Sequence, residues 1–347
     1  MIARKAELNG ASRPTIRDVA NAAGVSTATV SNVLRKTRFV RPERRKKVLD
    51  AIASLGYSPN LIASGLRARR SRMVGIVVPD ITTSFFGSIV RRIEELASGS
   101  DYQILLVDTQ EDAEREYERV RALIRHQADG LIFIPCADSR RTLAEIRRSE
   151  IPTIIVDRSE GGRQFDSTAV DNLSAARQGC CHLLSLGHRR IVFLASEPRL
   201  RNISDRIKGY CAAMKDAGLG RQSRVLIGGM SSDLGRAAVQ RVLQTPHPPS
   251  AIFASTHVMA LGALRAVWEA GLKVPQTVSV LAFDDCDWMT ALRPFLSTIR
   301  QPIEAIAQEA WSVLNNRLQR RDIDRVYREL PCSLIVREST ARAVVSR

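Results

Sequence analysis

Hydrophobic residues recur at two different spacings along the chain, and the spacing changes near residue 73. Between residues 15 and 54 they repeat at the three- to four-residue period of an amphipathic helix. Beyond residue 73, short uninterrupted apolar runs alternate with amphipathic stretches, a pattern typical of strands and helices in turn. The pattern therefore predicts a small helical region followed by a larger α/β region.

Capping signals define three helices in the first region. Thr15 is a good N-cap with Asp18 in the first turn, Gly24 can supply a left-handed turn, and Ser26 can cap a second helix. The expected helices begin after Thr15, run from Thr27 to about Leu34, and run from Pro42 to about Ser54. The residues expected to face their core are Ile16, Val19, Ala20, Ala23, Val25, Val30, Val33, Leu34, Val48, Leu49 and Ile52. Two helices joined by a short glycine-containing turn predict a helix-turn-helix.

Uninterrupted apolar runs in the second region predict parallel strands buried on both faces. They cover residues 73–79, 102–108, 130–135, 151–157, 188–196, 250–255 and 278–283. Helical stretches between them indicate doubly wound sheets, and the series is long enough for two. The polar, glycine-containing stretch 158–166 is expected to be the linker that divides them.

Positive charge is concentrated in the first region. The chain carries 52 Lys+Arg and 36 Asp+Glu, a formal net charge of +16. Residues 1–72 contain 16 basic and 4 acidic residues, a net charge of +12, whereas the rest of the chain contributes only +4. A basic region attached to a nearly neutral one indicates that the first region binds a polyanion such as nucleic acid.

Several other classes of protein are disfavoured by the sequence. It contains no apolar run of about 18 residues and no apolar stretch of a secretory signal near its start, so we expect a cytoplasmic protein without a membrane partner. Its six cysteines form no Cys-x-x-Cys pair and indicate buried structural thiols rather than a metal site. Phosphate-loop, zinc-protease and nucleophile-elbow motifs are absent, so no catalytic residue and no cofactor is expected.

Residues 15–60 closely resemble the DNA-binding headpiece of the lac repressor family. Further segments are similar to family signatures in the same order, among them VGIVVPDITTSFF (74–86), DRIKGYCAAMKDAGL (205–219), VSVLAFDD (278–285) and VRES (336–339). The resemblance implies an N-terminal all-α helix-turn-helix headpiece and an α/β core with two lobes like those of periplasmic binding proteins. It also implies a DNA-binding transcriptional regulator, with a repressor favoured over an activator.

The same resemblance divides the chain into regions. It implies a basic arm (1–14), a headpiece (15–58), a hinge (59–72) and an effector-binding and dimerisation domain (73–347). Lobe 1 is expected to comprise about 73–161 with 297–330, and lobe 2 about 162–296 with the C-terminal end. Binding to palindromic operator DNA calls for two-fold symmetry, and no leucine heptad follows VRES, so we expect a homodimer rather than a tetramer.

The resemblance also assigns DNA contacts. Thr27, Ala28 and Asn32 occupy base-facing positions of the second helix, and an asparagine can pair with adenine where many relatives carry an arginine suited to guanine. In the hinge, Leu66 would wedge into a minor-groove base step. The other candidate contacts, several of which are also capping positions, are Thr15, Ser26, Thr29, Ser31, Asn60, Ala63 and Arg67.

The resemblance also implies an effector cleft, with polar residues at strand ends and aromatic walls. Arg206 aligns with a family arginine that grips ligand hydroxyls or a carboxylate, and of Phe85 and Phe86 only one is expected to touch the ligand. The remaining candidates are Asp157, Met230, Thr256, Asp284, Trp288 and Gln301. His257 is more often structural than a contact. The expected effector is a polyhydroxylated small molecule, either a sugar or a sugar acid.

The sequence disfavours three other functions. A nucleotide-dependent dehydrogenase would need Gly-x-Gly-x-x-Gly after an early strand, and the sequence lacks it. A periplasmic sugar-binding protein would need a signal peptide and has no use for residues 15–60. A nucleoid protein without an effector would not need an α/β region of this size.

Overall fold

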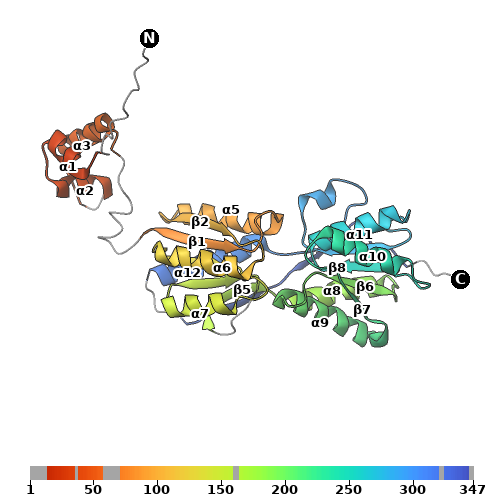
Figure 1. The fold of residues 1–347 in the computed structure, drawn as a ribbon. Coiled ribbons are helices and arrows are strands. Elements are labelled where there is room, and N and C mark those ends of the chain that lie inside the picture. Colours follow the sequence, from red (N-terminus) through yellow and green to blue (C-terminus); the bar gives the residue numbers. More distant parts are fainter. Residues whose placement is uncertain (1–13, 36–37, 58–70, 159–163, 320–323, 344–347) are drawn as a thin grey trace, which may run out of the picture. The chain divides into compact units, whose positions relative to one another are not determined.

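The computed structural model describes residues 14–35, 38–57, 71–158, 164–319 and 324–343. The chain divides into two compact units, Met1–Ser71 and Arg72–Arg347 (Figure 1). None of the described helices is both long and apolar enough to cross a membrane.

The first unit contains three helices, α1 (Ile16–Ala23), α2 (Thr27–Arg35) and α3 (Pro42–Leu55). The backbone N–H and the hydroxyl of Thr15 both donate to Asp18 at 2.7 Å, and the Asp18 N–H donates back to the Thr15 hydroxyl at 3.4 Å. Gly24 ends α1 with a left-handed φ of 63°. The Ser26 hydroxyl accepts from the Thr29 N–H at 3.2 Å. The predicted caps and helix-turn-helix are confirmed.

One predicted core position of this unit is wrong. Leu49 is 47% exposed, whereas Val48 is fully buried. The face of α3 that packs on the other helices carries Val48, Ala51, Ile52 and Leu55, which follow a spacing of three and four residues. Leu49 stands one residue out of this register, so its side chain points about 100° away from the core.

Lobe 1 of the second unit is a six-stranded, wholly parallel sheet with strand order β11-β5-β4-β3-β1-β2. Its strands are β1 (Met73–Val78), β2 (Gln103–Asp108), β3 (Gly130–Phe133), β4 (Thr153–Val156), β5 (Asp166–Val170) and β11 (Tyr327–Leu330). Alternate strand residues pack on α5 (Ser84–Ser98) and α12 (Ile303–Leu318), or on α6 (Ala113–Arg125) and α7 (Arg140–Ser149). Helices therefore cover both faces of the inner strands, as the uninterrupted apolar runs predicted. The prediction is wrong for residues 102–108, because β2 lies at the edge of the sheet and its residues are exposed or half-buried.

Lobe 2 repeats this plan with strand order β12-β10-β9-β8-β6-β7, in which only the β10–β12 pair is antiparallel. Its strands are β6 (Ile191–Ala195), β7 (Arg224–Ile227), β8 (Ala251–Ala254), β9 (Ser279–Phe283), β10 (Ser297–Arg300) and β12 (Ser333–Ile335). One face packs on α8 (Asn172–Ser185) and α9 (Arg201–Asp216), the other on α10 (Ser232–Leu243) and α11 (His257–Glu269). Each helix pair is close, since a Cβ on Gly209 or Gly262 would overlap a carbonyl oxygen of the neighbouring helix.

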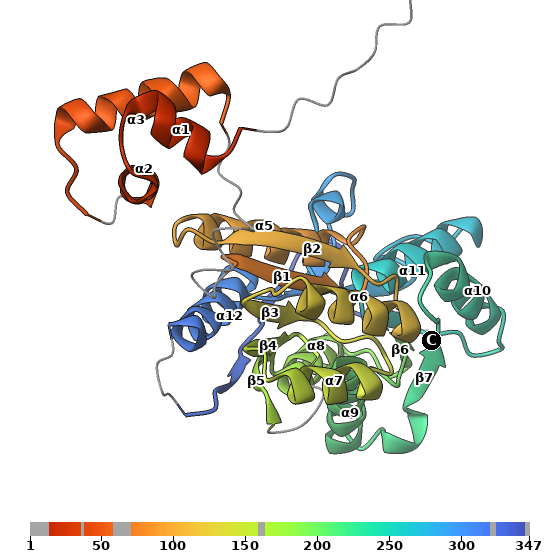
Figure 2. The same ribbon diagram turned by 60° about the vertical axis from the view of Figure 1, so that its left-hand side comes forward.

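Three connections join the lobes: β5 to α8, β10 to α12, and β11 to β12. Figures 1 and 2 show the C-terminal helix α12, in blue, among the orange and yellow elements of lobe 1. This arrangement corrects both predicted lobe boundaries. Strand β5 belongs to lobe 1, since it pairs with β4, and β10 belongs to lobe 2, since it pairs with β9.

The boundary error has a physical cause. Strand β5 has the sequence DSTAV and lacks an apolar run, yet every residue in it is buried. Asp166 is only 1% exposed because Arg317 of α12 donates to its carboxylate at 2.9 and 3.0 Å. A polar strand can be buried when a distant residue supplies its partner, and the local pattern does not reveal that partner.

Candidate functional site

The exposed face of α2 carries small polar side chains. Thr27 and Ala28 are exposed, and Ser31 and Asn32, one helical turn further on, are half-buried. Val30 is fully buried on the opposite face. A helix with this arrangement can place its N-terminal side chains against base edges while its apolar face stays packed on the unit.

Hydroxyl-bearing and basic residues come before and after these positions in the chain. Ser26 and Thr29 lie 3.0 Å apart through their hydroxyl oxygens at the start of α2, and Thr15 caps α1. Each hydroxyl retains hydrogen-bonding capacity for a phosphate because it carries one donor and two acceptor lone pairs. Residues 44–47 of α3, with the sequence RRKK, are all exposed. Four of the predicted DNA contacts, Asn60, Ala63, Leu66 and Arg67, lie outside the described residues.

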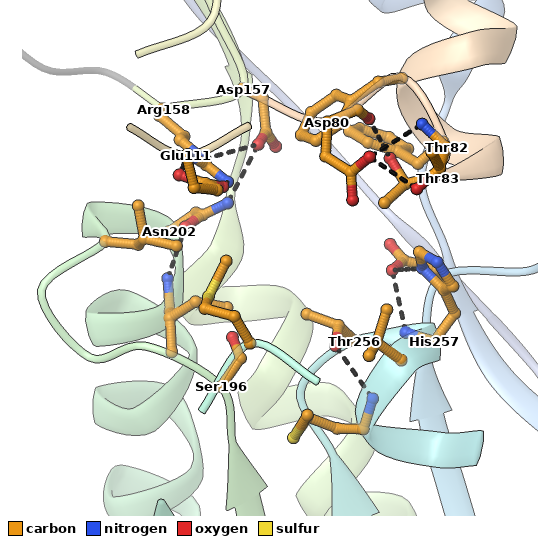
Figure 3. Close-up of a pocket in the computed structure, with 18 of the residues that line it drawn as sticks. Asp80, Thr82, Thr83, Glu111, Asp157, Arg158, Ser196, Asn202, Thr256 and His257 are labelled. Atoms are coloured by element: carbon orange, nitrogen blue, oxygen red, sulfur yellow. Dashed lines mark hydrogen bonds and ion pairs between the residues drawn. The ribbon is translucent and has the colours of Figure 1, made fainter. Parts of the chain in front are cut away.

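A cavity of about 440 Å³ opens between the two lobes of the second unit. Its walls come from the segments that follow the carboxyl ends of parallel strands in both sheets, which is where open α/β sheets bind ligands. Figure 3 shows Asp80, Glu111, Asp157 and Arg158 entering from lobe 1, and Ser196, Asn202, Thr256 and His257 entering from lobe 2.

Arg206 lies at the centre of the polar lining. It is 1% exposed, its Nε donates to the Asn172 side-chain oxygen and its Nη1 to the Ser255 carbonyl, both at 2.7 Å. Its guanidinium lies 3.5 Å from the centroid of the Phe283 ring. Burial lowers the pKa of Arg206, and the nearby carboxylates of Asp284 and Asp157 oppose that effect. Its Nη2 has no hydrogen-bond partner among the described residues, so one donor is available to a ligand.

Two buried aspartates occupy equivalent places in the two lobes. Asp157 follows β4 and Asp284 follows β9, with left-handed φ values of 65° and 72°. This conformation costs on the order of 1–3 kcal/mol for a non-glycine residue and is concentrated at ligand sites. In both cases the backbone turns immediately after the strand, and the carboxylate lines the cavity.

The two carboxylates differ in their surroundings. Burial raises the pKa of Asp157, whose Oδ2 accepts from the Asn202 side chain of lobe 2 at 3.0 Å. Asp284 accepts from the His257 ring at 3.1 Å and from the Gln301 amide at 2.7 Å. Burial acts to raise the pKa of Asp284, but these hydrogen bonds and the charge of Arg206 lower it to about 2. Asp284 is therefore held as a carboxylate.

A partly buried ion pair lies on the lobe 1 wall. The Nη2 and Nη1 of Arg158 donate to the two carboxylate oxygens of Glu111 at 2.6 and 3.0 Å, and Nη1 also donates to the Pro135 carbonyl at 2.7 Å. The paired, fork-like geometry fixes both side chains. The cavity is thus lined by charged groups whose orientation is set before a ligand arrives.

The comparisons with known proteins bear on both units. Residues 15–60 match the family described as bacterial regulatory proteins, lacI family, and residues 181–340 match a periplasmic binding protein-like domain. Catabolite control protein A of Priestia megaterium is 33% identical over 330 residues, which are 94% of this chain and 99% of that protein. The chain belongs to the lacI family of bacterial regulatory proteins.

Solved structures of lacI family proteins share the architecture. The Lac repressor dimer bound to operator and the anti-inducer ONPF is 27% identical, with a TM-score of 0.85 over 95% of this chain and all of that chain. A LacI family transcriptional regulator from Enterococcus faecium with bound ribose is 27% identical, with a TM-score of 0.72 over 78% of this chain and all of that chain. The predicted family and fold class are confirmed, and the chain is a DNA-binding transcriptional regulator.

The structure brings eight of the nine predicted effector residues of this lacI family protein to one cavity. They are Phe85, Phe86, Asp157, Arg206, Met230, Thr256, Asp284 and Gln301. Phe85 and Phe86 both line the cavity, with ring centroids 5.3 Å apart; that only one of them touches the effector stays a prediction. Their places in the cavity are compatible with ligand contact, which stays a prediction.

Trp288 is the exception among the predicted effector residues. It lies in the short helix η3 (Asp287–Thr290) and packs against an apolar cluster of lobe 2 rather than lining the cavity. Asp285, between Asp284 and this helix, is held by Arg300 and Arg337. The predicted place of Trp288 in the cavity is therefore corrected, because its side chain is taken up by the apolar packing of lobe 2.

Several lining residues were not predicted from the sequence. Glu111 and Arg158 follow β2 and β4, so the rule that selected Asp157 would also have selected them. Asn202 lies one helical turn before Arg206 on α9, which places both on the same face. His257, expected to be structural rather than a ligand contact, holds Asp284 and also lines the cavity.

Proposed function

We propose that this regulator represses transcription by binding a specific operator as a homodimer, and that a small polyhydroxylated effector controls the operator affinity. Thr27, Ala28 and Asn32 of α2 would contact base edges, and the groups around them phosphates. The effector would bind Arg206, Asp157 and Asp284 in the inter-lobe cavity. The chain would act in the cytoplasm and catalyse no reaction.

The observation that carries this proposal is that residues of both lobes line the cavity. A ligand changes an equilibrium only if it binds one arrangement better than another. A molecule that contacts Asp157 of lobe 1 and Arg206 of lobe 2 favours one mutual arrangement of the lobes. The names of the similar structures, a repressor dimer with operator and a regulator with ribose, support the same combination.

Self-association is supported by exposed apolar side chains in both lobes. Leu105 and Leu106 are exposed on β2, an edge strand of lobe 1. Leu234 and Trp268 are exposed on the α10–α11 side of lobe 2. Such apolar side chains are available to an interface between two copies of the chain.

The proposal is tested with an operator selected by the full-length chain from random DNA. Its affinity is measured with and without each member of a panel of sugars, nucleosides and sugar acids. We expect at least one compound to change the affinity by 5- to 150-fold, about 1–3 kcal/mol of coupling. A reporter gene behind the operator should be expressed more strongly when the regulator is removed. Binding without any coupled compound, or activation of the reporter, would contradict the proposal.

A further inference from the structure

The effector cavity has an excess of acidic side chains. Its lining includes the carboxylates of Asp80, Asp108, Glu111, Asp157 and Asp284 but only two guanidinium groups, those of Arg158 and Arg206. With histidine counted as neutral, the formal excess is three negative charges. An excess of two remains if Asp157 binds a proton, so the sign does not depend on that residue.

Both guanidinium groups already interact with carboxylates. Arg158 is paired through two nitrogens with Glu111, and its Nε lies 3.9 Å from the Asp157 carboxylate. Arg206 is hydrogen-bonded to Asn172 and Ser255, and the nearby carboxylates of Asp284 and Asp157 stabilise its charge against the effect of burial on its pKa. A carboxylate or phosphate on the ligand would have to compete with these fixed groups for the same positive charge. Burial makes the resulting repulsion stronger than it would be in water.

Asp80 and Asp108 have no such compensation. Asp80 lies two residues after the end of β1, and Asp108 is the last residue of β2; the two strands are neighbours in the sheet, with Val78 directly paired to Asp108. The N–H and hydroxyl of Thr82 donate to Asp80 Oδ1 at 2.8 and 2.6 Å, and the Gln110 N–H donates to Asp108 Oδ1 at 3.3 Å. Within the described part of the chain neither carboxylate forms an ion pair. Figure 3 shows the Asp80 carboxylate directed into the space between the lobes.

Four buried polar atoms of the lining indicate what else the ligand carries. The acceptors Asp157 Oδ1 and Gln301 Oε1 and the donors Arg158 Nε and Arg206 Nη2 lack hydrogen-bond partners among the described residues. Each of these side chains is at most 5% exposed. A hydroxyl group both donates and accepts, so adjacent hydroxyls can satisfy all four atoms, whereas a carboxylate can only accept and would leave the two acceptors without a partner.

We infer that the effector carries hydroxyl groups and no carboxylate or phosphate. Among compounds of equal shape the cavity prefers the one with a protonated amine, which would lie near Asp80 and Asp108. The inference rests on the proposed effector site and narrows it. A sugar acid, one of the two classes suggested by the sequence, is rejected.

The test uses matched sets that differ in charge alone. Glucose, glucosamine and glucuronate form one set, and galactose, galactosamine and galacturonate another, all measured by calorimetry on the full-length chain at equal ionic strength. In any set that binds, we expect the amine to bind about tenfold more tightly than the neutral sugar and the acid more weakly than both. An acid that binds more tightly than its neutral parent would overturn the inference.

The double variant Asp80→Asn, Asp108→Asn assigns the preference to these two carboxylates. Asparagine keeps the oxygen that accepts from Thr82 or Gln110, so the turns are preserved. The advantage of the amine over the neutral sugar should fall to within about twofold. Asp101→Asn is the matched control, an exposed carboxylate of the same lobe outside the cavity, and it should leave the advantage unchanged. An advantage that persists in the double variant would contradict the assignment.

If none of these sugars, amines and acids binds, a measurement without ligand tests the acidic excess of the cavity. Removing two uncompensated negative charges should raise the melting midpoint by about 1–2 °C at low salt relative to Asp101→Asn. The gain should shrink at high salt because mobile ions screen the repulsion. A midpoint that is unchanged or lower would overturn the charge argument. If an acid binds best and changes operator affinity, this inference fails and effector control stands; if amines bind best but no compound alters operator affinity, effector control fails instead.

Discussion

In the helical unit the candidate contact residues lie close together in the sequence and face solvent, whereas in the cavity they come from both lobes and are mostly buried. Thr27, Ala28 and Asn32 share one helix of nine residues. The cavity residues extend from Asp80 to Gln301 and depend on one another for hydrogen bonds. Base preference can therefore change one side chain at a time, but effector preference changes with a coupled set of groups.

The two regions also differ in the source of their charge. The helical unit presents exposed basic side chains at its surface, such as Arg44 and Lys46. The cavity contains fixed pairs of opposite charge together with an acidic excess. A surface of the first kind attracts DNA of any sequence and responds to salt. A cavity of the second kind selects a small molecule that can bind the lining groups that have no partner within the protein.

The largest expected effect comes from separating the regions. A chain reduced to Arg72–Arg347 retains four apolar clusters and both sheets, so it should fold and bind the effector. Its operator affinity should fall at least about a thousandfold, the usual margin of specific over weaker binding. Fluorescence anisotropy with labelled operator measures this. An operator affinity within tenfold of that of the full chain would show that the helical unit does not carry DNA binding.

Arg206→Ala should break the link between the regions. The effector response, about 1–3 kcal/mol of coupling, should be lost, while operator affinity without effector stays within a few-fold of the original. The reason is that Arg206 lies in the cavity and α2 belongs to the other unit. Operator titrations with and without the compound found in the screen measure the response.

Controls separate recognition from folding in this case. Arg206→Lys keeps a positive charge between Asp157 and Asp284 but loses the forked donors, so it should fold and still respond weakly. Asp284→Asn should weaken the response less than Arg206→Ala. Arg177→Ala removes an exposed lobe 2 arginine paired with Asp216 and should respond like the original chain. A normal response in Arg206→Ala would remove the cavity from the mechanism.

Asn32→Arg tests whether a single side chain sets base preference. Arginine pairs with guanine and asparagine with adenine, so preference at one position of each half-site should shift by about 1–3 kcal/mol. A selected-site assay reads this directly. Asn21→Arg, the same substitution on an exposed position of α1, should strengthen binding without changing the preferred sequence. An unchanged preference in Asn32→Arg would exclude Asn32 from base reading.

Leu66→Ala has the smallest expected effect. If Leu66 wedges into a base step, its loss should weaken specific binding by about 1 kcal/mol and leave salt-driven binding to random DNA nearly intact. Leu61→Ala, in the same segment, is the control and should change neither. Equal losses on operator and random DNA would indicate a general effect on folding.

The sequence by itself determined the local features of this protein. Thr15, Gly24 and Ser26 predicted helix ends correctly because a cap acts within three or four residues of its own position. Seven strands were evident from their uninterrupted apolar runs, and six of them are buried because helices cover both faces of the sheet there; the edge strand β2 is the exception. The basic first unit was visible because charge does not depend on folding.

Only the tertiary structure decided which segments share a lobe and which side chains share the cavity. Strand β5 is buried because Arg317, about 150 residues later, neutralises Asp166. Trp288 faces its lobe, while Asn202 crosses to Asp157 of the other lobe. The uncompensated state of Asp80 and Asp108 also depends on which arginines are already paired. In each case the free energy of a polar group depends on its partner, and in a parallel α/β fold the partner comes from a distant part of the chain.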